Sequence, residues 1–148
     1  MARADASQLD DRLVAAITEL CERGDDDVEA GRFAEAIARY REALTLVPSP
    51  VHAWAVSIWI HGAIAEAYYL GGEYARARDA IDDAFRCDGA IGNAFLHLRL
   101  GQIEDRLGNR GRALDELIRA YTRSGEDVFA GEDPRYLALV KEAIAGDG

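Results

Sequence analysis

The sequence predicts an all-α fold, and three observations indicate it. Proline, which costs about 3 kcal/mol inside a helix, occurs only at Pro48, Pro50 and Pro134. Alanine, the best helix former, occurs 27 times in 148 residues. No segment alternates β-branched and polar residues with a period of two, and no Asn-Gly or Asp-Gly turn joins two such runs. A chain of 16.2 kDa is long enough for one sizeable core.

Prolines and glycines divide the chain into seven predicted helices. Ser49-Pro50 and Asp133-Pro134 are typical of an N-cap followed by proline in the first turn. Ser7 with Asp10 resembles a capping box for the first helix. Glycines interrupt the apolar patterns elsewhere, as helix ends do. The predicted helices are Ser7–Ala30, Phe33–Leu46, Pro50–Leu70, Tyr74–Arg86, Asn93–Leu107, Gly111–Arg123 and Pro134–Ala145.

A repeat appears when the segments are aligned on three glycines, Gly31, Gly72 and Gly108. Each glycine is followed after five residues by alanine, after nine by a large residue and after twelve by a second alanine. Seven residues before each glycine stands a small residue, which lets two helices approach closely. The small residues are Gly24, Ala65 and Gly101, and the large ones are Tyr40, Ile81 and Leu117.

This pattern resembles the tetratricopeptide repeat, or TPR. The resemblance implies a single domain over residues 1–148, a right-handed α-α superhelix of about three helix pairs with an N-terminal extension and a C-terminal capping helix. The repeats would cover about 17–50, 58–91 and 94–125, and the capping helix about 134–145. The chain departs from the motif at Asp27 and Glu104, where tyrosine is expected, and at Arg23 and Arg110, where apolar residues are expected.

The segments IWIHGAIAEAYYLGGEY, GNAFLHLRLGQ and GEDVFAGEDPRYLALVKE are similar to a family of small, single-domain bacterial TPR proteins. Some members of that family are encoded beside polymorphic toxins, which implies a role as immunity proteins for those members.

The TPR resemblance also implies a concave groove, lined by the first helix of each pair, that binds a protein or peptide. The predicted groove residues are Trp59, Glu66, Tyr69, Phe95, Arg99, Gln102 and Arg106. Two alternatives stay open. The aromatic residues Trp59 and Phe95 could fill the core, packed on the N-terminal helix or on each other. The arginines could lie on a solvated face or in ion pairs, such as Arg99 with Asp105.

The charge balance bears on the partner. Lys plus Arg is 17 and Asp plus Glu is 27, so the net charge is −10. This charge repels phosphate backbones and anionic lipid, and we therefore expect no nucleic acid and no membrane surface as partner. A basic protein or peptide is the electrostatic complement. The start lacks the pattern of a signal peptide, and the apolar stretch from Trp54 to Leu70 is interrupted by polar residues, so we expect a cytoplasmic protein.

Residues that could carry chemistry are sparse. His61 and His97 occupy equivalent places in adjacent repeats, which allows a metal or proton-transfer role but is more typical of packing. Cys21 and Cys87 are expected to be ordinary buried thiols. The acidic clusters, 25–29, 126–127 and 132–133, lack the pattern of a calcium loop and are expected to be solvated, or else to dock a basic partner.

The sequence contains no phosphate-binding loop, no dinucleotide fingerprint and no nucleophile elbow. We therefore expect no enzyme, no catalytic residue, no metal and no cofactor. Three hypotheses follow: an immunity or antitoxin-type protein that binds a basic toxin domain, a general adaptor or regulatory scaffold in a bacterial complex, and a metal-dependent enzyme on an α-solenoid. Self-association is left open.

Overall fold

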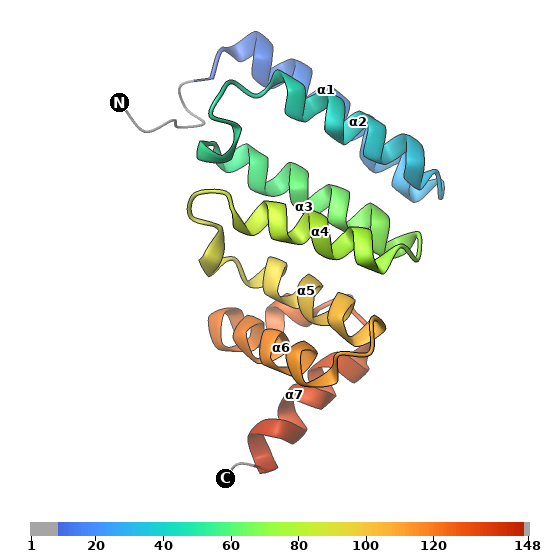
Figure 1. Ribbon diagram of the computed structural model, residues 1–148, viewed down its shortest axis with the longest axis vertical. Helices are drawn as coiled ribbons and strands as arrows, with labels where there is room; N and C mark the ends of the chain where they lie inside the picture. The colour runs from blue at the N-terminus through green and yellow to red at the C-terminus, as the bar shows by residue number, and fades with distance from the viewer. Residues whose placement is uncertain (1–8, 147–148) are drawn as a thin grey trace. The chain divides into compact units, whose positions relative to one another are not determined.

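The computed structural model of the chain describes residues 9–146, and within that range it contains helices and turns but no strand. Figure 1 shows the helices in chain order. They are α1 (Asp11–Glu29), α2 (Phe33–Leu46), α3 (Ala55–Leu70), α4 (Tyr74–Phe85), α5 (Ala94–Arg106), α6 (Arg110–Ser124) and α7 (Pro134–Gly146), with 3-10 turns η2 (Val51–Ala53), η3 (Ala90–Gly92) and η4 (Gly125–Phe129). The predicted all-α class is confirmed.

The chain forms two compact units, one ending at Ala90 and the other beginning at Ile91. In the first unit α1 packs against α2 and α3 packs against α4, and α2 also contacts α3. In the second unit α5 packs against α6, and α7 packs against α6 and η4. Each pair is a helical hairpin, as the repeat predicts.

The core of the second unit joins α5, α6, η4 and α7. Tyr136 and Val140 of α7 are buried there against Leu98 and Leu117. Phe129 of η4 is buried in the same cluster. The C-terminal helix is therefore fixed to the unit by apolar burial.

The close approach predicted for the small residues is confirmed within two of the pairs. A β-carbon built on Gly24 would lie 2.6 Å from Cε1 of Tyr40, and one built on Gly101 would lie 2.7 Å from Cγ of Leu117. Real β-carbons do not approach other atoms so closely. The small residue of the first helix therefore makes room for the large residue of the second.

Two departures from the repeat motif are compensated by hydrogen bonds. Asp27 and Glu104, both buried, replace the expected tyrosine at the end of a first helix. The Asp27 carboxylate accepts a hydrogen bond from Nε of Arg32 at 3.1 Å, and Glu104 accepts one from Nδ2 of Asn109 at 2.8 Å. A buried carboxylate needs such partners, because burial without them is costly. In both cases the donor lies five residues later, at the N-cap position of the next helix.

Most predicted helix ends agree with the structure, but the starts predicted for α1 and α3 are wrong, since α1 begins at Asp11 rather than near Ser7. We expected α3 to begin at Pro50 with Ser49 as its N-cap. The backbone at Pro50 is extended instead, and α3 begins only at Ala55. Side chains donate hydrogen bonds to the backbone carbonyls of this segment. Nε1 of Trp54 donates to the Pro48 carbonyl at 2.8 Å, and Oγ of Ser57 donates to the Val51 carbonyl at 2.6 Å.

Two further N-caps were predicted, one for α7 and one for α1. The α7 helix begins at Pro134 as expected, and Oδ1 of Asp133 accepts from the Arg135 amide at 3.0 Å. Asp10 is the N-cap of α1 and accepts from the Arg12 amide at 2.7 Å. Ser7, the other half of the predicted capping box, lies outside the described residues.

We predict that Gly101→Ala lowers the free energy of unfolding by about 1–3 kcal/mol, because the new methyl group overlaps Leu117 and the Ala113 carbonyl. Urea denaturation followed by circular dichroism measures the change. Gly111→Ala is the matched control, because nothing lies within 4 Å of its built β-carbon. The control is expected to stabilise the protein by up to about 1 kcal/mol through helix propensity. A stabilised Gly101→Ala variant would contradict the close-approach interpretation.

Candidate interaction surfaces

The predicted groove residues divide between the two units. Trp59, Glu66 and Tyr69 lie on α3 in the first unit. The other four lie on α5 in the second unit: Phe95, Arg99, Gln102 and Arg106. Within each unit, helical periodicity places its members on one side of their helix.

In the first unit, α3 presents large apolar side chains to solvent. Trp59 is 67% exposed and Leu70 is 49% exposed. The alternative in which Trp59 fills the core is therefore wrong. Tyr69 is half-buried, with its ring 5.6 Å from the ring of Tyr74 on α4. An exposed tryptophan with no place in the core is the type of residue that anchors protein interfaces.

Acidic groups surround Tyr40 in the same unit. The Tyr40 hydroxyl donates to Oδ1 of Asp25 at 2.6 Å. Burial, this hydrogen bond and the negative charges of Asp25 and Glu66 together raise the pKa of Tyr40 above its usual range. Asp25 of α1 and Glu66 of α3 thus both act on Tyr40 of α2. We call Asp25 together with the predicted groove residues of α3, Trp59, Glu66 and Tyr69, the α1–α3 acidic face.

Charge is distributed unequally between the units. The segment through Ala90 contains 17 acidic and nine basic side chains, whereas the segment from Ile91 contains ten acidic and eight basic ones. Most of the net charge of −10 therefore belongs to the unit that carries the α1–α3 acidic face. Its field attracts basic partners and repels acidic ones.

In the second unit, part of the predicted groove surface is covered by the chain itself. Arg99 and Gln102 are buried. Both donate to Oε1 of Glu132, at 3.0 Å from Nη1 of Arg99 and 3.0 Å from Nε2 of Gln102. The guanidinium of Arg99 also lies 5.1 Å from the centre of the Phe95 ring, which is half-buried. Arg106 is exposed.

Ion pairs of the groove arginines were one of the alternatives left open, with Arg99 and Asp105 as the example. The structure pairs Arg99 with Glu132 and Asp105 with Arg135. Glu132 was expected in a solvated acidic cluster, and it lies instead against α5. The contact of Glu132 with Arg99 was not predicted, because 33 residues separate the two residues and Glu132 occupies no position of the repeat motif.

The acidic cluster at the end of α1 is also partly structural. Asp27 is buried and pairs with Arg32 at 3.0 Å and with Arg39 at 3.5 Å. Asp26 and Glu29 are exposed, as expected for solvated charges.

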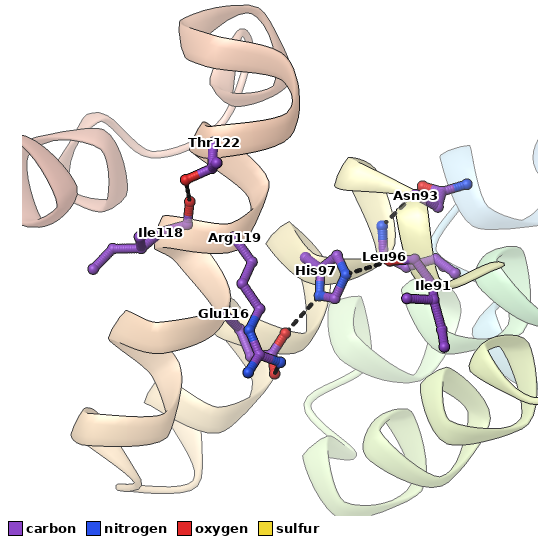
Figure 2. A network of polar contacts seen from close by, with 8 residues as sticks. All are labelled: Ile91, Asn93, Leu96, His97, Glu116, Ile118, Arg119 and Thr122. Carbon is purple, nitrogen blue, oxygen red and sulfur yellow. Dashed lines mark hydrogen bonds and ion pairs between the residues drawn. The ribbon is translucent and has the colours of Figure 1, made fainter.

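The buried His97 contacts polar groups through both of its ring nitrogens. Figure 2 shows the His97 ring between Glu116 of α6 and the backbone carbonyl of Ile91. Its Nδ1 lies 2.7 Å from Oε2 of Glu116, and its Nε2 lies 2.8 Å from the Ile91 oxygen. Arg119 pairs with the other oxygen of Glu116 at 3.2 Å. The buried His97 therefore ties the start of the second unit to α6, which favours the packing interpretation.

His61 in the first unit is half-buried. Burial lowers its pKa, and the charge of Asp83 opposes that shift in part. In residues 9–146 no group of three His, Cys, Asp or Glu side chains is arranged to hold a metal ion. The structure thus offers no support for the metal hypothesis in that range.

Both cysteines are free, with Cys87 buried and Cys21 half-buried. Burial raises the pKa of both thiols, and nearby carboxylates raise it further. Such thiols are poor nucleophiles. Separately, none of the described helices combines the length and the apolar character needed to cross a lipid bilayer.

No protein-family model matches the sequence, and no curated protein matches it. Solved structures do resemble it. The first TPR of Spaghetti (RPAP3), bound to the HSP90 peptide SRMEEVD, has a TM-score of 0.67 at 17% identity and covers 88% of this chain and 94% of its own. The C-terminal TPR-containing domain of a putative Plasmodium falciparum FK506-binding protein has a TM-score of 0.66 at 16% identity, with coverage of 95% and 94%.

The Sgt2 TPR domain from Aspergillus fumigatus has a TM-score of 0.65 at 21% identity and covers 89% of this chain and 82% of its own. At these identities the similarity establishes the fold alone. The chain has the helix pairs of a TPR domain, which confirms the fold that the sequence motif predicted.

We predict that Glu132→Gln lowers the free energy of unfolding by about 1–3 kcal/mol, because it removes the charge that faces the buried Arg99. Glu126→Gln is the control, since Glu126 pairs with Lys141 on the exposed surface, where solvent screens the interaction, and it should change the stability little. Thermal and urea denaturation compare the two variants. Equal effects would show that Glu132 is only a surface charge.

We also predict a contribution of His61 to acid sensitivity. Its pKa is lowered in the folded protein, so the unfolded chain binds the proton more readily. Stability is therefore lost as the pH falls through the unfolded value of about 6.5. His61→Gln should lose less stability than the wild type between about pH 7.5 and 5. His52→Gln, at an exposed histidine of the same unit, is the control for the loss of an imidazole. A His61→Gln variant that loses as much stability as the wild type would contradict the prediction.

Proposed function

We propose that this chain is a non-enzymatic TPR-type module that binds a basic segment of another protein on the α1–α3 acidic face. The observation that carries the proposal is the exposed Trp59 on the same helix as Glu66, in the unit that holds most of the negative charge. Trp59 would supply apolar and cation–π contact, and the carboxylates would supply attraction and orientation.

The acidic face argues for a basic ligand and against an acidic one. The peptide bound to the Spaghetti TPR, SRMEEVD, has three acidic side chains and one basic side chain. Asp25 and Glu66 would repel a peptide of that composition. Arg99, one of the two arginines of the predicted groove, is engaged by Glu132. A lysine- or arginine-rich helix or extended segment fits the open surface better.

An immunity or antitoxin-type role is the specific form of this function that we propose for test. The basic partner would then be a toxin domain, and binding alone would block the toxin's access to its target. The sequence resemblance and the acidic first unit support this form. An adaptor role would use the same surface with a non-toxic partner, so identifying the partner distinguishes the two roles.

We predict that Trp59→Ala weakens binding to the captured partner by 30-fold or more, about 2 kcal/mol, because Trp59 is the central exposed anchor. Glu66→Arg should slow association and reduce its dependence on salt. The measurement is affinity capture from native cells with mass spectrometry, followed by calorimetry with the purified partner and with SRMEEVD.

Ile91→Ala is the matched control, because Ile91 is 72% exposed but lies in the second unit. It should bind like the wild type. Equal capture by all three variants would overturn the assignment of the α1–α3 acidic face. Tight binding of SRMEEVD would overturn the charge argument. Rescue of cells from the captured partner's toxicity would support the immunity role, and a non-toxic partner would contradict it.

A further inference from the structure

The His97 ring on α5 lies between two oxygen atoms that accept hydrogen bonds (Figure 2). Its Nδ1 is 2.7 Å from Oε2 of Glu116 on α6, and its Nε2 is 2.8 Å from the carbonyl oxygen of Ile91 in η3. A carbonyl or an ionised carboxylate has no hydrogen to donate, and a neutral imidazole has a single N–H. A neutral His97 beside an ionised Glu116 could therefore make one of these two hydrogen bonds but not both.

The two contacts together require one additional proton, and the neighbouring charge of Arg119 indicates which group binds it. Nη1 of Arg119 on α6 lies 3.2 Å from Oε1, the other carboxylate oxygen of Glu116. A positive charge at that distance favours the ionised carboxylate, so the additional proton belongs on the imidazole rather than on Glu116. His97 then has an N–H for each acceptor, and Glu116 compensates the positive charge of the ring.

The other ionisable side chains near these contacts do not replace Glu116. On α6, Arg123 lies near the η3 turn, and η3 itself has no ionisable residue. Both Arg119 and Arg123 repel a charged ring, but Glu116 is in direct hydrogen-bond contact with it, and attraction is strongest at the shortest distance. The η4 turn, which also packs against α5, has Glu126 and Asp127, and both are exposed to solvent that screens their charge.

Burial makes both contacts depend on the proton. His97 is 8% exposed and Glu116 is 6% exposed, so water does not readily replace a lost partner. If the ring loses its proton, one nitrogen presents a lone pair to an oxygen, and a buried polar atom without a hydrogen bond is costly. The hydrogen bond to the charged Glu116 is the stronger of the two. A neutral His97 therefore keeps Glu116 and releases the Ile91 carbonyl.

The Ile91 contact holds the residue at which the second unit begins. The side chain of Ile91 is 72% exposed, so this residue has little apolar burial of its own. The hydrogen bond from His97 instead attaches its backbone to the unit. Loss of that bond would free the backbone at the place where the chain enters the second unit.

We propose that His97 is a proton-dependent clamp, which joins Ile91 to Glu116 as an imidazolium and releases Ile91 as a neutral imidazole. The clamp holds more firmly as the pH falls and opens as the pH rises, because the folded contact needs the bound proton. It lies within the second unit, so it goes beyond the proposed function and does not depend on the α1–α3 acidic face.

Nuclear magnetic resonance of the wild-type chain tests the proposal, because nitrogen chemical shifts distinguish a ring nitrogen that carries hydrogen from one that does not. His52, which is exposed, is the internal reference. At a pH where the His52 ring is neutral, both His97 nitrogens should carry hydrogen, with a ratio of charged to neutral ring at least about tenfold higher than for His52. Raising the pH further should remove the Nε2 hydrogen bond and shift the Ile91 carbonyl carbon signal in the same titration.

Glu116→Gln distinguishes a proton-dependent clamp from a contact that is only structural. The glutamine amide can donate to Nδ1 of a neutral imidazole, whose Nε2–H still donates to Ile91. This variant should therefore keep the Ile91 contact without the additional proton, and its Ile91 signal should lose the pH dependence. Asp115→Asn is the matched control, since it removes an exposed carboxylate from the same helix, and it should titrate like the wild type.

Circular dichroism checks that both variants are folded, and the wild-type measurement needs neither of them. A His97 ring with hydrogen on a single nitrogen, at the pH where His52 is neutral, would overturn the proposal. An Ile91 signal that follows the same titration in the wild type and in Glu116→Gln would also overturn it.

Discussion

The close approach of paired helices is the constraint on which the structure depends. Gly24 and Gly101 leave no space for a β-carbon because Tyr40 and Leu117 occupy it. This contact sets how deeply the second helix of a pair packs on the first. It also fixes which side of the first helix is buried, and therefore which side is left for other contacts. The interaction surfaces are consequences of this packing rather than independent features.

The helices α3 and α5 occupy equivalent places in the repeat, but they differ on the side that the second helix of their pair does not cover. On α3 that side carries Trp59, which is exposed. On α5 the carboxylate of Glu132 binds Arg99 and Gln102, and the segment before α7 covers them. Burying the guanidinium with a paired carboxylate avoids the cost of an isolated charge. A repeat that is regular in sequence therefore leaves a large aromatic side chain exposed on one helix, whereas on the equivalent helix another part of the chain binds the polar side chains.

Buried polar residues of the second unit serve as ties between elements. His97 bridges Glu116 and the Ile91 carbonyl, and Glu104 holds Asn109 at the start of α6. These groups are the types found in catalytic sites, but here each is engaged in joining two parts of the backbone. Function is therefore best sought in the exposed surfaces.

The sequence by itself determined the helix pairs, the small and large residues that pack them, and the excess of negative charge. It could do so because proline and glycine act on the local backbone and because the spacing of a helix repeats every few residues. Only the tertiary structure decided which predicted site residues are accessible. The contact of Arg99 with Glu132, and the delayed start of α3 through Trp54 and Ser57, depend on side-chain bonds that no periodic pattern records. Exposure of a residue is a property of everything packed around it, so Trp59 and Arg99, alike as predicted groove residues, differ in the folded chain.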